Sequence, residues 1–237
     1  MYIHIFANSK HNQRDKTMKK VLIFSAAAAF LASCGGNVEG EKVEAQEAQE
    51  VQEVAEAVSY AADVAATSLN WQGSDVAGKV HTGSIAISEG NLEVQDGNLV
   101  GGSFTVDMSS IVNFDVENEE YNAKLVGHLK SPDFFSIDSF PTATFEIASA
   151  SAYEGEGDYT HNITGNLTMK DITKSITFPA TVMINESGIE AKSAQFVIDR
   201  AEWNVRFRSP SFFDPAELKD KAINNEIGLE IAMVASK

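Results

Sequence analysis

The chain has 237 residues, of which 34 are acidic and 18 are basic, so its formal net charge at pH 7 is −16. Nucleic acids and anionic lipid surfaces are bound through Lys and Arg that neutralise phosphate, and this excess of negative charge excludes DNA and RNA as partners. Cys34 is the single cysteine, which excludes an intramolecular disulfide.

The N-terminal segment has the features of a bacterial lipoprotein signal. Two lysines precede an apolar run over residues 21–32, which is too short to span the ~30 Å hydrocarbon core of a bilayer. The Leu-Ala-Ser-Cys sequence at residues 31–34 matches a lipobox. We therefore predict a signal peptide over residues 18–33 and lipidation of Cys34 by a diacylglycerol. The alternative is an ordinary signal peptide with an incidental cysteine.

The predicted anchor determines the expected location. Two or more acyl chains hold a protein stably on a bilayer, so we expect a lipoprotein of the cell envelope, on the periplasmic side of a bacterial membrane, with the outer membrane favoured. Met18 is the natural start of such a signal, and residues 1–17 are predicted to be an extension outside the natural protein. Without residues 1–33 the chain loses five basic residues and one acidic residue, and its formal net charge becomes −20.

Residues 34–66 are predicted to form an acidic flexible tether. Glutamate recurs at every third position, at Glu41, Glu44, Glu47, Glu50, Glu53 and Glu56. On an α-helix a spacing of three drifts around the cylinder and places like charges at i,i+3, which argues against a coiled coil. A solvated linker that holds the domain clear of the headgroups is the better interpretation.

The remaining residues, 67–237, are enough for one domain with a sizeable core. Apolar and polar residues alternate through most of this range, which indicates strands with one apolar face each. The apolar stripes are His81 to Ile87, Phe104 to Met108, Ala143 to Ile147, Ile163 to Met169, Ile176 to Val182, Phe196 with Ile198, Trp203 to Phe207, and Ile227 to Met233. Turn signals lie at residues 89–91, 96–98, 154–158 and 185–188. The pattern predicts an all-β fold of about eight antiparallel strands in a closed barrel or a sandwich.

Two short helices are expected to interrupt the strands. Residues 119–129 place Tyr121, Leu125 and Leu129 on one stripe at i, i+4 and i+8. The Asp-Pro-Ala-Glu sequence at residues 214–217 is a helix start, with Asp as N-cap and Pro at the first helical position. Both helices are expected to cover ends or seams of the barrel.

Several segments of this domain, taken in order, resemble the YceI-like family. They are Trp71, His81-Thr82-Gly83, Gly101 to Phe104 with Asp107-Met108, His128 to Ser131 with Asp133 to Phe135, Phe140-Pro141, Gly165 to Thr168, and Arg200 with Trp203 to Val205. The resemblance implies an elongated eight-stranded antiparallel barrel similar to that of lipocalins, and a carrier of polyisoprenoid or amphiphilic lipid without catalytic activity. Asn204 departs from the glycine that members commonly have after this tryptophan, which bears on the local strand geometry and not on the fold.

The candidate ligand-binding residues are apolar side chains of the expected inner face together with one polar group. They are Phe104, Val106, Met108, Phe134, Phe135, Phe145, Phe178, Trp203, Phe207 and His81. Phenylalanine brings a large area without a polar atom that needs a partner, which suits a dry channel. A small eight-stranded barrel can equally be packed solid by its own side chains. The resemblance favours a channel, and Phe134 and Phe135 either cap an opening or anchor their loop to the core.

No residue pattern indicates catalysis, a metal or a cofactor. The histidines that follow the signal, His81, His128 and His161, lack metal-ligand spacing, and motifs for nucleophiles and phosphate loops are absent. His81 is interpreted as a core histidine or as a polar group near a ligand head, and His128 as a link from the short helix to a backbone carbonyl. Two alternatives to a carrier stay open: an envelope enzyme with His81 or His128 as general base, and a structural or stress lipoprotein with a solid core.

Arg206 and Arg208 are expected on an outward, charge-balanced face. The alternative is a basic rim that meets a pyrophosphate or a lipid headgroup. The predicted partners are a long-chain lipid ligand and the membrane that holds the acyl anchor, and a homodimer is left open.

Overall fold

The structure is a computed structural model that describes residues 38–237. Cys34, the predicted signal peptide and residues 1–17 therefore lie outside the described residues. The strands are β1 (Glu41–Lys42), β2 (Val58–Ala62), β3 (Ser68–Asp75), β4 (Val80–Gln95), β5 (Asn98–Asn113), β6 (Thr142–Ala152), β7 (His161–Met169), β8 (Ile172–Asn185), β9 (Gly188–Ser193), β10 (Phe196–Asp199) and β11 (Ile223–Ser236). The helices are α1 (Glu119–Lys130) and α2 (Pro215–Leu218), with 3-10 helices η1 (Arg200–Trp203) and η2 (Lys219–Lys221).

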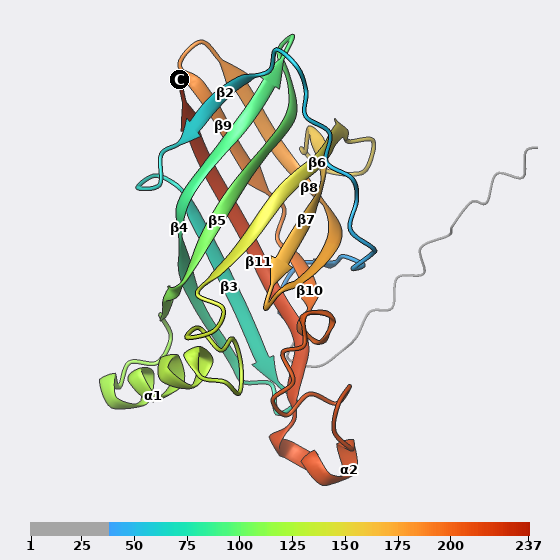
Figure 1. The fold of residues 1–237 in the computed structure, drawn as a ribbon. Helices are drawn as coiled ribbons and strands as arrows, with labels where there is room; N and C mark the ends of the chain where they lie inside the picture. The colour runs from blue at the N-terminus through green and yellow to red at the C-terminus, as the bar shows by residue number, and fades with distance from the viewer. Residues whose placement is uncertain (1–37) are drawn as a thin grey trace, which may run out of the picture. The chain divides into compact units, whose positions relative to one another are not determined.

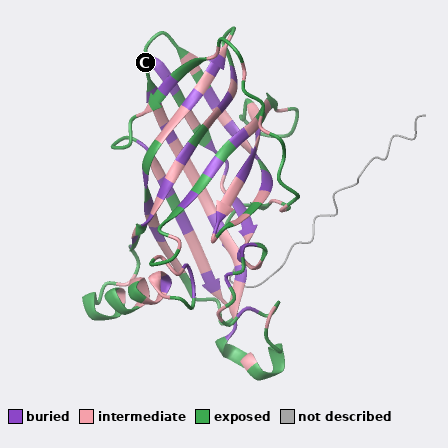
Figure 2. Cartoon of the chain, in the orientation of Figure 1, coloured by how far each residue is buried: buried purple, intermediate pink, exposed green. Residues whose placement is uncertain are grey.

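The sheet closes on itself as an eight-stranded antiparallel ring (Figure 1). Each strand from β3 to β8 pairs with the next strand in the chain, and β11 pairs with both β9 and β3, which closes the ring. β2 continues the position of β3 along β4 and β11, and β10 continues the position of β9 along β11. The predicted barrel is confirmed. Buried and less buried positions alternate along its strands, as the period of two requires (Figure 2).

The two longest strands are joined by a tight turn that fixes their register. β4 and β5 have 16 residues each, or about 50 Å at ~3.3 Å per residue. Between them Asp96 (φ 52°) and Gly97 (φ 79°) take the left-handed conformation that an Asp-Gly hairpin turn requires. The turn predicted at residues 96–98 is confirmed.

The turn predicted at residues 89–91 is wrong, because these residues continue β4. A bulge after Ile87 shifts the inward-facing set by one residue, so that Ile87 and Leu92 are both buried. Gly90 serves a close approach here, since a Cβ atom at this position would come within 2.9 Å of the Phe104 side chain.

Residues 38–57 lie along the outside of the barrel, and we call this segment the strap (Figure 1). Its β1 pairs in parallel with β10, and Gln46 exchanges two backbone hydrogen bonds of 2.9 and 3.0 Å with Ser175 of β8. The strap thereby fills the seam between β8 and β10, which do not pair with each other. Further along, the Asn166 side chain donates to and accepts from the backbone of Gln49, at 2.8 and 2.9 Å.

This arrangement differs from the flexible tether predicted over residues 34–66. The period of three suits an extended chain with three residues per turn better than it suits an α-helix. All six glutamates of the repeat are exposed, whereas Val43, Val51 and Val54 are half-buried. The repeat therefore separates a solvated face from a face that packs on the barrel.

Both predicted helices are confirmed, and both lie at the barrel end opposite the C-terminus (Figure 1). The Asn118 side chain caps α1 by accepting from the Tyr121 amide, and the Asp214 side chain caps α2 by accepting from the Ala216 amide. Within residues 38–237, no helix has the length and apolar character needed to cross a bilayer.

Candidate ligand-binding cavity

The half of the barrel nearest the helices contains a cavity of about 390 Å³. Inward-pointing side chains of the strands form most of its wall. The rest comes from α1 and the loop after it, from the 3-10 helices η1 and η2, and from the loops at this end of the barrel. Its apolar wall includes Leu69, Trp71, Ile85, Val106, Met108, Ile111, Leu129, Ala143, Met169, Ile198 and Leu229. This volume lies within the 300–1,000 Å³ typical of small-molecule sites.

Four phenylalanines follow the last wall residues of this cavity along the strands and separate it from the other half of the barrel. Phe104, Phe145, Phe178 and Phe196 come from β5, β6, β8 and β10, and we call them the phenylalanine layer. Successive ring centroids lie 5.3, 5.6 and 4.4 Å apart, and the last pair is stacked with an interplanar angle of 1°. Beyond the layer is a second cavity of only about 40 Å³. None of the described residues lines both cavities.

The loop after α1 forms part of the cavity wall. Phe134 and Phe135 are both buried and both line the cavity. The Phe135 amide donates to the Leu129 carbonyl at 3.1 Å, which folds the loop back onto the helix. The His128 ring meets the Phe134 ring edge to face at 5.1 Å. The sequence left open whether these two phenylalanines cap an opening or anchor their loop to the core. In the structure they anchor the loop and also face the cavity.

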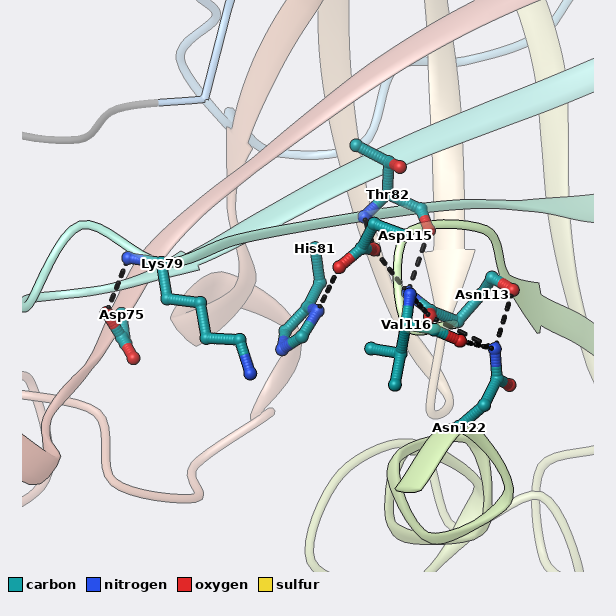
Figure 3. A network of polar contacts seen from close by, with 8 residues as sticks. All are labelled: Asp75, Lys79, His81, Thr82, Asn113, Asp115, Val116 and Asn122. Carbon is teal, nitrogen blue, oxygen red and sulfur yellow. Dashed lines mark hydrogen bonds and ion pairs between the residues drawn. The ribbon is translucent and has the colours of Figure 1, made fainter. Parts of the chain in front are cut away.

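His81 lines the cavity and belongs to a polar network between β4, β5 and α1 (Figure 3). Its Nδ1 lies 2.8 Å from Asp115 Oδ2, while the Thr82 amide donates to Asp115 Oδ1 at 2.8 Å. Asn113 and Asn122 extend the network to the start of α1. Burial alone would raise the pKa of the Asp115 carboxyl, but the hydrogen bonds from Thr82, His81 and Asn113 outweigh it and hold the pKa below its usual value.

His128 has a different partner from the one predicted. Its Nε2 lies 3.1 Å from Asp133 Oδ2, so it pairs with a carboxylate of the following loop and not with a backbone carbonyl. It also lines the cavity. Among the described residues, no group of three or more His, Cys, Asp or Glu side chains is arranged to hold a metal ion.

Arg200 is a buried cation at the cavity wall, with 1% of its surface exposed. Its guanidinium donates to the backbone carbonyls of Val205, Phe207, Ile223 and Asn224 at 2.7–3.0 Å. Burial lowers the pKa of Arg200 to about 10, against the opposing influence of nearby carboxylates, so the group remains protonated at pH 7. Arg200 thus ties the loop after η1 to the start of β11 and holds this end of the barrel together.

Charged side chains mark the mouth of the cavity. The exposed wall residues Lys79, Arg208 and Lys221 are basic, and Asp220 is acidic. The sequence left two interpretations open for Arg206 and Arg208: an outward, charge-balanced face or a basic rim. Arg208 lines the mouth of the cavity and so fits the second interpretation. Arg206 is exposed and rests its guanidinium 4.5 Å from the Phe212 ring centre, away from the cavity wall.

The structure separates the ten predicted ligand-binding residues into three groups. Val106, Met108, Phe134, Phe135 and His81 line the large cavity. Phe104, Phe145 and Phe178 belong to the phenylalanine layer and face the small cavity. Trp203 and Phe207 line neither cavity.

The strand predicted from Trp203 to Phe207 is wrong. Trp203 ends the 3-10 helix η1, is fully buried, and donates its indole N–H to the Leu167 carbonyl at 3.0 Å. Asn204 follows in the left-handed conformation with φ 56°, which reverses the chain direction. Both glycine and asparagine tolerate this conformation. Asn204, which stands where members of the family commonly have glycine, is therefore compatible with the turn.

Sequence reasoning missed the wall residues Leu69, Trp71, Met169 and Leu229, and the role of Arg200. The four apolar residues carried a usable signal, because each lies on an alternating stripe. Arg200 carried none, because its partners are backbone carbonyls brought together only by the fold.

A closed eight-stranded barrel with an apolar cavity open at one end defines a lipocalin-like class of small β-barrel proteins. Within that class, this chain belongs to the YceI-like domain family, whose model matches residues 60–235.

Curated relatives match a shorter stretch. A UPF0312 protein of Pseudomonas putida is 41% identical over 54 residues, and Protein YceI of Salmonella arizonae is 43% identical over 56 residues. The chain spans only 27% of the length of each of these relatives, and the matches cover 23% and 24% of the chain.

Two solved structures share the fold. BcnA of Burkholderia cenocepacia is 21% identical with a TM-score of 0.56, and the match covers 74% of this chain and 99% of BcnA. A polyisoprenoid binding domain from Saccharophagus degradans is 12% identical with a TM-score of 0.53, and the match covers 75% of this chain and 97% of that domain. At these identities the likeness concerns the fold alone.

Proposed function

We propose that this protein binds a polyisoprenoid or another long-chain amphiphile in its barrel cavity, as a carrier or store in the cell envelope and without catalytic activity. The observation that carries the proposal is the cavity of about 390 Å³, walled by apolar and aromatic side chains, in one half of a barrel whose other half is packed. The polyisoprenoid binding domain of Saccharophagus degradans, which shares the fold, supports an isoprenoid as one class of ligand.

The energetics suit an exchangeable ligand. Burial of each methylene group from water is worth ~0.8 kcal/mol. A lipid tail comes from a bilayer, however, so most of this free energy cancels. The net affinity then depends on how well the tail fits and on how the head group is bound.

The charged side chains of the cavity favour a zwitterionic or polar head group. Lys79, Arg208 and Lys221 supply three cations, and Asp75, Asp220 and Glu226 supply three carboxylates beside them. Opposite charge at a mouth attracts and orients a charged ligand. The proposed orientation therefore has the tail pointing into the barrel and the head group at the helix end.

The proposed location is the periplasmic side of a bacterial membrane, with a diacylglycerol on Cys34 as anchor and the outer membrane favoured. The lipobox at residues 31–34 supports this part of the proposal. Mass spectrometry of the purified mature N-terminus tests it. An unmodified Cys34, or peptides from residues 2–14 in the mature protein, would contradict it.

The binding proposal is tested on the full chain carrying Cys34→Ser, purified without detergent. Native mass spectrometry with organic extraction is expected to find a long-chain lipid bound, and Phe135→Asp is expected to lose it, because a carboxylate would enter the apolar wall. Phe114→Ala, which alters a phenylalanine that is 63% exposed, is the matched control and should retain the lipid. An empty barrel that refuses prenol and fatty-acid probes would support a structural lipoprotein instead. Turnover of a lipid ester that His81→Ala abolishes would support an enzyme.

A further inference from the structure

We infer that the phenylalanine layer limits the length of the tail that this cavity accepts, and that the protein selects tails on the order of fifteen carbons over longer polyisoprenoids. The inference rests on the proposed function and deepens it by specifying the ligand. It starts from a difference in length: the longest strands extend about 50 Å, whereas the cavity occupies only the half of the barrel nearest the helices.

The boundary between hollow and packed barrel is one layer of side chains thick. On β5 the cavity wall ends at Val106, and the next inward residue is Phe104. On β6 the corresponding step is from Ala143 to Phe145, and on β10 it is from Ile198 to Phe196. The change from smaller aliphatic side chains to phenylalanine therefore occurs at the same level on three strands.

The rings of the layer are held in place by the backbone around them. Phe145 lies against Gly165 of β7, where a Cβ atom would come within 2.4 Å of its ring. Gly90 of β4 lies against the Cβ atom and backbone of Phe104, where an added Cβ atom would come within 2.9 Å. All four phenylalanines are buried, with 7% exposure or less. Because protein interiors are close-packed, rings that fill the space above a glycine cannot swing aside without opening a void. The layer is thus a fixed floor.

The volume above this floor sets the capacity of the site. At about 30 Å³ for each water-sized group, the large cavity holds on the order of a dozen methylene-sized groups. The small cavity beyond the floor adds room for about one more. A farnesyl chain or a single acyl chain fits this space with its head at the charged mouth, whereas an octaprenyl chain must leave most of its length outside.

The test is a binding series on the full chain carrying Cys34→Ser, with saturated fatty acids and prenols of increasing length competing against a fluorescent fatty acid. Affinity is expected to rise by roughly fourfold per added methylene while the cavity fills, and to level off near fifteen carbons. Phe104→Ala is expected to move this plateau to longer chains by joining the two cavities. Ala143→Leu narrows the cavity above the floor and is expected to move the plateau to shorter chains.

Phe114→Ala is the control and should leave the plateau unchanged. An affinity that continues to rise to octaprenol in the unaltered chain, or a plateau that none of the layer variants moves, would overturn the length limit and leave the proposed function standing. Failure of every chain length to bind would overturn both. If Phe104→Ala does not fold, Phe104→Leu takes its place, because it removes part of the same ring from the layer, and a plateau that it leaves unchanged would overturn the length limit.

Discussion

The two halves of the barrel are built by the same strands and filled in different ways. In the half away from the helices, phenylalanine rings meet across the interior and leave a void of about 40 Å³. In the half near the helices, the same alternation of inward residues surrounds a void of about 390 Å³. The period of two therefore tells which residues face inward and does not tell whether the interior is filled.

Two physical differences separate the halves. The packed half sets phenylalanine rings against one another, and the Phe145 ring also fills the space above Gly165 on the neighbouring strand. The hollow half is bordered by loops that polar groups hold in place: Arg200 binds four carbonyls, and Asn113 and Asn122 connect α1 to the strands. The loops contribute wall residues without collapsing inward, and the cavity persists.

The largest expected effect comes from removing the cation that holds the hollow half. Arg200→Met should lower the free energy of unfolding by about 3–5 kcal/mol, because four buried carbonyls lose a charged donor. Urea unfolding measures the change. Arg200→Lys keeps the charge but reaches fewer carbonyls, so its free energy of unfolding should lie between those of the unaltered protein and Arg200→Met. A loss below about 1 kcal/mol would show that these loops are held by other contacts.

Matched truncations in the two halves should differ. Phe145→Ala in the phenylalanine layer is expected to cost about 3–5 kcal/mol, because it opens a new cavity in a packed region. Phe135→Ala in the cavity wall is expected to cost about 2 kcal/mol, which is mainly the lost burial of the ring. Both are measured by urea unfolding of lipid-free protein, and equal losses would mean that the two halves are packed alike.

The strap gives a smaller effect. Asn166→Ala removes both hydrogen bonds to Gln49 and should destabilise the protein by about 1–2 kcal/mol. Hydrogen exchange should then become faster over residues 41–50. Asn162→Ala on the same strand is the control, and an identical exchange pattern in the two variants would contradict the role given to Asn166.

Acid should act on the two halves at different pH. In the packed half, burial lowers the pKa of His161 below its usual 6.5, so the unfolded chain takes up this proton first and stability falls as pH drops through 6.5. In the hollow half, the lowered pKa of Asp115 means that its contribution is present above pH 3.8 and is lost as pH falls below that value. Thermal unfolding against pH should show the higher step vanish in His161→Gln and the lower step vanish in Asp115→Asn. A variant that keeps its step would contradict the assignment.

Local periodicity and capping predicted about eight antiparallel strands and both helices, but they left a barrel and a sandwich equally open. The barrel and its channel were implied by the resemblance to the YceI-like family, and five of the ten proposed ligand-binding residues line the large cavity. The sequence placed Trp203 in a strand because Trp203, Val205 and Phe207 alternate, but the left-handed turn at Asn204 ends that regularity. It also treated the glutamate repeat as solvated on all sides. The partners of the strap, Ser175 and Asn166, lie more than a hundred residues away in the chain, and only the closed sheet brings them together.

The strap has a consequence for how this domain is delimited. Sequence similarity to the family begins at residue 60, after the whole strap. A shortened protein that starts there would leave the Ser175 backbone and the Asn166 amide without their partners and would open the β8–β10 side of the wall to water. The match to the family model thus leaves out a segment that is hydrogen-bonded to the barrel wall, and the acidic repeat is part of the structure of the barrel.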